Sequence, residues 1–217
     1  MILHIGGGRL KGWVRPEVTG DPEKDEVICA LWLSLSIYNP DLIVTDITER
    51  SHWCARFISL AEEAGLSCIT RLKGVALTGR VKSVAADMSD MPHLMPIFTA
   101  LCARSTDACC ISMEKPGYNS REIFRLTCQM AQDAGADCAA LYDRLMIKGL
   151  AGGKKLPGGI IDTGGDWRIA AASLPLAYIS ADTISVSHAQ AMDEAFPGFW
   201  QHFADHGGNT DIAKTTE

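Results

Sequence analysis

The sequence predicts a single α/β domain, with a largely parallel sheet covered by helices on both faces in a Rossmann-like three-layer sandwich. Short apolar segments typical of strands alternate with longer segments of helical spacing, and this alternation is typical of parallel sheets. The chain has 217 residues, of which 47% are hydrophobic and 21% charged, enough to bury one core. We expect one domain over residues 1–208 and a flexible tail over residues 209–217.

The first predicted elements are strands over residues 2–5 and 42–44, with a helix between them. Asp21-Pro22-Glu23 opens this helix with a capping side chain, a proline at the first helical position and an acid in the first turn. Asn39-Pro40 ends it. A second helix is expected to follow from about Ser51.

Residues 66–86 have a different character from the rest of the chain. Leu66–Thr70 continues as a strand, and Val75–Ala86 is rich in β-forming residues interrupted by glycines. This pattern predicts an antiparallel ribbon added to the parallel sheet.

The second half of the chain resumes the alternation of helices and strands, with one long loop. The expected segments are a helix over 90–104, a strand over 108–113, a helix over 119–135, a strand over 137–142, a loop over 149–166, a strand over 176–179 and a helix over 187–207. Asn119 and Glu122 have the spacing of a capping box, and the loop contains seven glycines. No internal repeat is evident in the sequence.

Charge and hydropathy limit the function classes. The chain has 26 acidic and 20 basic residues, a net charge of −6, which argues against a protein that coats nucleic acid. The amino terminus lacks the regions of a secretory signal, and the longest apolar stretches are too short to span a bilayer. We therefore expect a cytoplasmic protein with no membrane partner.

The eight cysteines do not form a recognisable metal or redox motif. No Cys-x-x-Cys pair exists, and most cysteines lie inside apolar helix or strand patterns, so we expect buried free thiols. The vicinal pair Cys109–Cys110 leaves open a redox or soft-metal role. His202 and His206 lie one helical turn apart, a spacing that can chelate zinc, although no third ligand is evident beyond His188.

Carboxylates follow three of the predicted strands. In an open α/β sheet, ligands bind beyond the carboxyl ends of the strands, and Asp46, Glu114 and Asp143 each stand at such an end. If the strands are neighbours, these acids meet, and close carboxylates either raise a pKa or recruit a divalent cation. We predict that all three are catalytic and that Asp46 and Glu114 hold Mg²⁺. The alternative is that they cap helices.

Two glycine-rich segments are candidates for anion binding. Gly6-Gly7-Gly8 can bring backbone amides close to an anion, but its spacing departs from the Rossmann fingerprint. The segment 148–155 lacks Walker spacing and suits a basic lid instead. We expect Gly6, Gly7, Gly8, Lys115 and Lys154 to contact the anion, with a tight turn and a solvated loop as the alternatives.

These features predict an enzyme, a hydrolase or a transferase, that acts on a phosphorylated small molecule or a nucleotide. One alternative is a metal-dependent nuclease that uses the same acids, with a basic ribbon on the phosphate backbone. The ribbon residues are Arg71, Lys73, Arg80 and Lys82. Nucleic acid is the less favoured partner. The other alternative is a non-catalytic assembly or interaction module.

Overall fold

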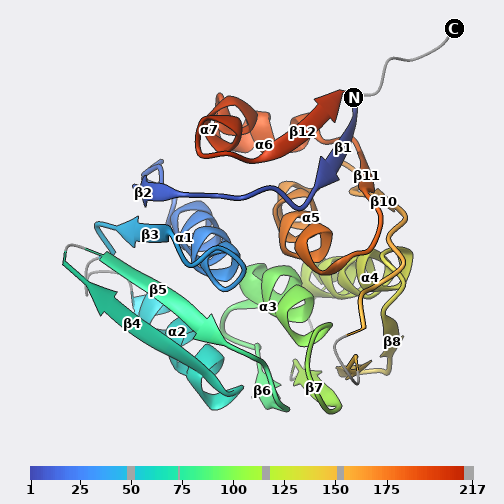
Figure 1. Ribbon diagram of the computed structural model, residues 1–217. Helices are drawn as coiled ribbons and strands as arrows, with labels where there is room; N and C mark the ends of the chain where they lie inside the picture. The colour runs from blue at the N-terminus through green and yellow to red at the C-terminus, as the bar shows by residue number, and fades with distance from the viewer. Residues whose placement is uncertain (48–51, 73, 114–117, 151–153, 213–217) are drawn as a thin grey trace, which may run out of the picture.

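A computed structural model describes residues 1–47, 52–72, 74–113, 118–150 and 154–212. Over these residues the chain forms three four-stranded sheets arranged around a central group of helices (Figure 1). The α/β class is therefore confirmed, whereas the single Rossmann-like sheet is wrong. The strands divide among three sheets because each single pair of parallel strands is followed by two strands that are antiparallel to each other, a hairpin in two of the sheets and the two ends of the chain in the third.

The first of these sheets is formed by residues 12–79. Its elements are β2 (Gly12–Val14), α1 (Pro22–Ser36), β3 (Leu42–Thr45), α2 (His52–Glu63), β4 (Leu66–Arg71) and β5 (Gly74–Gly79). Strands β2 and β3 pair in parallel across α1, and the β4–β5 hairpin adds two antiparallel strands, which gives the order β2-β3-β5-β4. This hairpin confirms the antiparallel ribbon expected near residues 66–86.

Residues 85–148 repeat the same arrangement. The elements are β6 (Ala85–Asp87), the 3-10 helix η1 (Pro92–Leu94), α3 (Met95–Cys102), β7 (Cys109–Ser112), α4 (Tyr118–Asp133), β8 (Asp137–Ala140) and β9 (Arg144–Lys148). The strand order β6-β7-β9-β8 again places one parallel pair beside an antiparallel hairpin.

The third sheet joins the two ends of the chain. Its elements are β10 (Ile160–Asp162), α5 (Trp167–Ile179), β11 (Ile184–Ser187), α6 (Gln190–Ala195), α7 (Phe199–Asp205), β12 (Asn209–Ile212) and β1 (Ile2–Gly6). The order β10-β11-β1-β12 matches the other two sheets, with β1 in the place of β5 and β9 and β12 in the place of β4 and β8. Residues 209–212, expected as the start of a flexible tail, thus form a paired strand. The three units are a structural repeat that the sequence did not indicate.

Helices α1, α3 and α5 pack against one another at the centre of the molecule (Figure 1). Every residue of α1 from Glu26 to Ser36 is buried, as is every residue of α3. Helices that are apolar on all sides are stable only when other elements surround them. The three sheets surround the central helices in this way. Among the described residues, no helix has the length and hydrophobicity needed to cross a bilayer.

The three central helices run in the same direction, which gives the molecule two distinct ends. Near their starts, Glu26 of α1 contacts His93 of η1. Near their ends, Tyr38, Arg104 and Tyr178 line one cavity. We call the end where α1, η1–α3 and α5 begin the amino pole, and the opposite end the carboxyl pole.

Candidate functional site at the amino pole

The amino pole receives the carboxyl ends of the parallel strands from all three sheets, because each central helix runs antiparallel to the strands it connects. Residues at or just after the ends of these strands form ion pairs there. Arg15 pairs with Asp46 in the first unit, and His188 with Asp162 in the third, each at 2.9 Å. Asp46 and His188 occupy equivalent positions after the second strand of their units, with φ of 57° and 56°. The repeat therefore shapes both strand ends in the same way.

A buried acid–imidazole pair lies beneath the amino pole. His93 Nε2 is 2.7 Å from Glu26 Oε2, and the two side chains are only 5% and 4% exposed. Burial lowers the pKa of His93, and Arg168 acts in the same direction, whereas Glu23 opposes the shift. The imidazole shares one short hydrogen bond with the carboxyl group of Glu26.

The start of α5 holds an arginine at the pole. Asp166 caps the helix by accepting the backbone N–H of Arg168. The guanidinium of Arg168 donates to both carboxylate oxygens of Asp166, at 3.0 and 2.6 Å. Its side chain stays 26% exposed. This bidentate contact fixes the guanidinium in one orientation while leaving part of it accessible to a ligand.

Arg121 contributes a second cation from the start of α4. Its guanidinium lies 5.9 Å from the ring centroid of Tyr142, and Nη2 is 3.5 Å from the Tyr142 hydroxyl. Among the ion pairs of the described residues, Arg121 has no carboxylate partner, whereas Arg144 and Arg168 do. Within the described residues no carboxylate neutralises Arg121, so its charge is available to an anionic ligand.

Acid is expected to destabilise the fold from about pH 6.5 downward. The folded state lowers the pKa of His93 and of His202 from the ordinary value of 6.5, in both cases mainly through burial. Below pH 6.5 these two histidines are therefore protonated more readily in the unfolded chain than in the folded one, so the free energy of unfolding falls as the pH drops below 6.5. Thermal unfolding between pH 5 and 8 measures this slope. The variant His93→Gln should flatten it, and equal stability at both ends of the range would contradict the assignment.

The structure separates the acids expected at one edge of a sheet. Asp46 follows β3 in the first sheet, and Asp143 lies in the β8–β9 turn of the second, where its carbonyl accepts the Met113 N–H. Both reach the amino pole, and each has its own arginine; the Arg144 hydrogen bond holds the pKa of Asp143 below its ordinary value. Glu114 lies outside the described residues. The catalytic role of the three acids stays a prediction.

The residues expected to bind an anion fall at the other pole. Gly6 and Gly7 line a cavity there together with Lys155, the neighbour of the exposed Lys154. At Gly8, a Cβ atom would lie 2.6 Å from the Gly207 carbonyl oxygen, so close packing accounts for this glycine. Lys115 lies outside the described residues. The anion-binding role of these residues also stays a prediction.

The basic ribbon does not form one patch. Arg71 pairs with Gly74 beside the hairpin turn, whereas Arg80 follows Gly79 at the opposite end of the β4–β5 ladder. These ends are roughly 17 Å apart at about 3.4 Å per residue, and Lys73 lies outside the described residues. No group of three or more metal-ligating side chains is found within the described part of the chain. Neither the nuclease alternative nor zinc at the histidine pair gains support.

Sequence reasoning missed the side chains that the amino pole brings together: Glu26, His93, Arg121, Asp166 and Arg168. Two signals pointed to some of them. Asp166 stands directly before an apolar run, the position of a helix cap, and Arg121 lies within the predicted capping box. The contact between Glu26 and His93 joins residues 67 positions apart and has no local signal.

The fold is shared with solved transferases. EPSP synthase from Acinetobacter baumannii matches with a TM-score of 0.66 and 15% identity, over 92% of this chain and 48% of its own. The enolpyruvyl transferase NikO from Streptomyces tendae matches with a TM-score of 0.67 and 14% identity, over 86% of this chain and 44% of its own. At such identities the likeness establishes the fold alone.

Sequence comparison identifies the family. The family model of EPSP synthase (3-phosphoshikimate 1-carboxyvinyltransferase) matches residues 23–203, and the chain belongs to this family. The 3-phosphoshikimate 1-carboxyvinyltransferase of Clostridium perfringens is 29% identical over 184 residues, covering 84% of this chain and 40% of the relative. That of Clostridium acetobutylicum is 25% identical over 207 residues, covering 94% and 46%. The chain thus spans less than half the length of these relatives.

The family corrects one prediction from the sequence. A hydrolase that binds nucleotides and magnesium was one reading of the acidic strand ends, but the family is named for a transferase. Neither nucleotide nor magnesium is supported by the comparisons. The broader expectation, that the substrate is a phosphorylated small molecule, agrees with the name of the family.

Proposed function

We propose that this chain supplies a substrate-binding half-site for carboxyvinyl transfer to a phosphorylated small molecule of the 3-phosphoshikimate type. The observation that carries the proposal is the meeting of three helix starts with Arg121 and Arg168 at the amino pole of a chain that belongs to this family. The relatives are more than twice as long as the matched segment. We therefore propose ligand binding, and not turnover, for this chain.

The charges at the amino pole suit an acidic ligand. The starts of α1, η1–α3 and α5 each carry a partial positive charge. Asp21 and Asp166 offset part of this field, since each caps its own helix. Arg121 and Arg168 then supply localised cations with forked donors, the geometry that binds phosphate and carboxylate groups most strongly.

The carboxylates at the same pole suit a ligand that also carries hydroxyl groups. Asp21 accepts backbone N–H groups of Glu23 and Lys24 and is still exposed. A carboxylate oxygen has further acceptor capacity for a ligand hydroxyl. An acid that carries both phosphate and hydroxyl groups would use both kinds of partner at once.

Binding should depend on the two arginines. In isothermal titration calorimetry with 3-phosphoshikimate, Arg121→Gln and Arg168→Gln are each expected to weaken binding by about 10- to 100-fold, since a charge-assisted hydrogen bond contributes about 1.5–3 kcal/mol. Arg168→Lys keeps the charge and should lose less. This charge-conserving variant also shows whether a loss comes from the missing cation or from misfolding.

Arg9→Gln is the matched control. Arg9 forms an exposed pair with Asp41 at 2.9 Å, close to the start of β3 and therefore toward the carboxyl pole. Arg9→Gln should leave the binding of 3-phosphoshikimate unchanged. The proposal fails if 3-phosphoshikimate binds equally well to Arg121→Gln, Arg168→Gln and the unaltered chain, or if it does not bind at all.

A further inference from the structure

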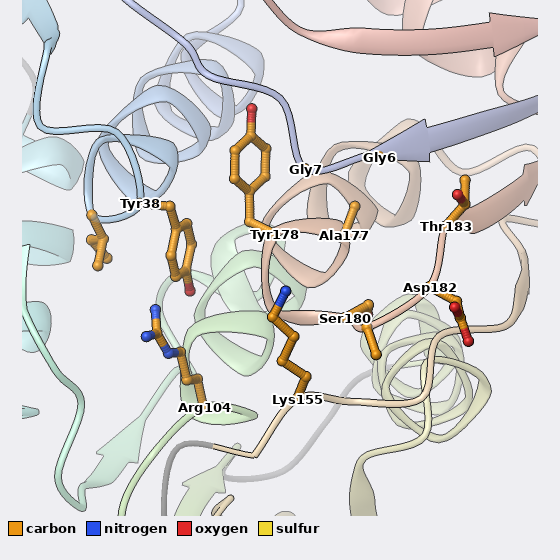
Figure 2. A pocket seen from close by; sticks show the side chains of 12 residues that line it. Gly6, Gly7, Tyr38, Arg104, Lys155, Ala177, Tyr178, Ser180, Asp182 and Thr183 are labelled. Atoms are coloured by element: carbon orange, nitrogen blue, oxygen red, sulfur yellow. The ribbon is translucent and has the colours of Figure 1, made fainter.

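A separate cavity lies at the carboxyl pole, at the opposite ends of the same central helices. Its volume is about 540 Å³, within the range of small-molecule sites. Figure 2 shows that Tyr38, Arg104 and Tyr178 approach it from the segments at or just beyond the ends of α1, α3 and α5, and that Lys155 enters from the segment before β10. Four segments distant in sequence therefore converge on one cavity.

One side of this cavity is cationic. Arg104 and Lys155 both line it, and the ion pairs formed among the described residues include neither of them. The Arg104 guanidinium is held over the Tyr38 ring, 5.3 Å from its centroid. Tyr38 in turn stacks on Tyr178, with centroids 5.8 Å apart and an interplanar angle of 18°. The aromatic pair fixes the position of the guanidinium without neutralising it.

The other side of the cavity is anionic. Asp182 lines it beyond Ser180 and lies away from Arg104 in Figure 2. The ends of α1 and α5 also border the cavity, α1 through Ile37 on the side of Tyr38 and Arg104 and α5 through Ser180 nearer Asp182 (Figure 2), and each helix end carries a partial negative charge of about one half. Together with the Asp182 carboxylate, these ends nearly cancel the two cations. The cavity is therefore close to neutral overall, with Arg104 and Asp182 on opposite sides of it (Figure 2).

The tyrosine next to the cations stays protonated. Burial raises the pKa of Tyr38 to about 12, although Arg104 acts in the opposite direction. Its hydroxyl group therefore remains a neutral donor and acceptor at physiological pH. Ile37, Ala177 and the tyrosine rings contribute the smaller, apolar part of a lining that is mostly polar, so the cavity offers little to a large apolar ligand.

We propose that this cavity binds a small zwitterion, an α-amino acid with a short or polar side chain. Its carboxylate contacts Arg104 and Lys155, and its ammonium group contacts Asp182 and the carbonyl end of α5. A simple anion satisfies only the cationic side and meets the negative helix ends, whereas a zwitterion satisfies both sides. This site does not depend on the function proposed for the amino pole.

Isothermal titration of the full chain with small solutes tests the proposal. Glycine and L-serine should bind with dissociation constants of about 1 mM or below, a weak but measurable affinity. Acetate, inorganic phosphate and ethylammonium each carry only one of the two charges and should bind at least about tenfold more weakly. L-Phenylalanine should bind more weakly than L-serine, because its ring finds little apolar surface.

Matched variants locate the binding. Lys155→Gln and Asp182→Asn should each weaken glycine binding about tenfold or more, as expected for loss of one charge-assisted contact. The controls Lys148→Gln and Asp137→Asn remove the members of an exposed pair, 3.8 Å apart, that does not line the cavity. They should leave glycine binding unchanged.

Three results would overturn the proposal. The first is that neither glycine nor L-serine binds. The second is that inorganic phosphate binds as tightly as glycine, which would make the cavity an anion site. The third is that Lys155→Gln and Asp182→Asn bind glycine as the unaltered chain does. All four substituted side chains in this test are exposed, so circular dichroism should show the native fold in each variant.

Discussion

Replacing Trp32 by alanine is expected to lower the free energy of unfolding by about 3–5 kcal/mol, the cost typical of removing a buried tryptophan from a core. Trp32 is 1% exposed and lies in α1. Its ring is 6.0 Å from Phe199, 6.2 Å from Phe203 and 5.6 Å from His202, measured between centroids. The indole thus joins a central helix to α7, and its loss leaves a cavity that these rings cannot fill without moving. Urea unfolding followed by circular dichroism measures the change.

Trp13 provides the control for Trp32. It is 53% exposed on β2, so Trp13→Ala should change the free energy of unfolding by no more than about 0.5 kcal/mol. A loss below about 1 kcal/mol in Trp32→Ala would contradict the packing described here, because cavity formation in a core costs more than that.

Replacing His93 by alanine should cost about 3 kcal/mol, because one member of a buried polar pair is removed and the Glu26 carboxyl group loses its short hydrogen bond. The two side chains are almost fully buried at 2.7 Å from each other. They connect α1 to η1, so the loss also loosens two central helices. Equilibrium unfolding in urea at pH 7.5 gives the magnitude.

A double-mutant cycle isolates the contribution of the pair itself. Glu26→Leu/His93→Leu should cost less than the two single substitutions added together, with a coupling energy of about 1–3 kcal/mol. Glu23→Ala on the same helix is the control, since Glu23 is exposed. Strict additivity of the two leucine substitutions would show that the contact carries no net stability.

The helix α1 and the β4–β5 ribbon could be predicted because their signals are local. Asp21 caps α1 by accepting the N–H groups of Glu23 and Lys24, as the sequence indicated. The segment Leu66–Arg71 and its partner strand form the expected antiparallel ladder. In both cases, capping chemistry and β-forming residues agree with the tertiary structure.

The helix α5 was mistaken for a strand over 176–179 because its environment hides the helical pattern. Residues of α5 are buried nearly all round, so no amphipathic stripe appears. Pro175 within it also suggested a break. The strand β10, which follows the glycine-rich loop, has only three residues. A strand of that length is too short to show an alternating pattern of apolar and polar residues. Tertiary packing decides both elements.

The candidate site was predictable only in part. The expectation that chemistry gathers beyond the carboxyl ends of parallel strands led to Asp46 and Asp143, and the structure places both strand ends at the amino pole. It did not lead to Arg121 or Arg168, which stand at helix starts. Their shared location depends on the packing of three units whose repetition is structural and not visible in the residues.

The most direct test of the central claim is to map where 3-phosphoshikimate binds by the shifts of backbone amide resonances. If the amino pole is the half-site, the largest changes upon titration fall on residues 21–24, 121–122 and 166–169, at the starts of α1 and α5 and in the first turns of α4. Resonances of Gly6, Gly7 and Arg104 at the carboxyl pole should stay in place. The account is contradicted if the shifts concentrate at the carboxyl pole, or if no resonance moves.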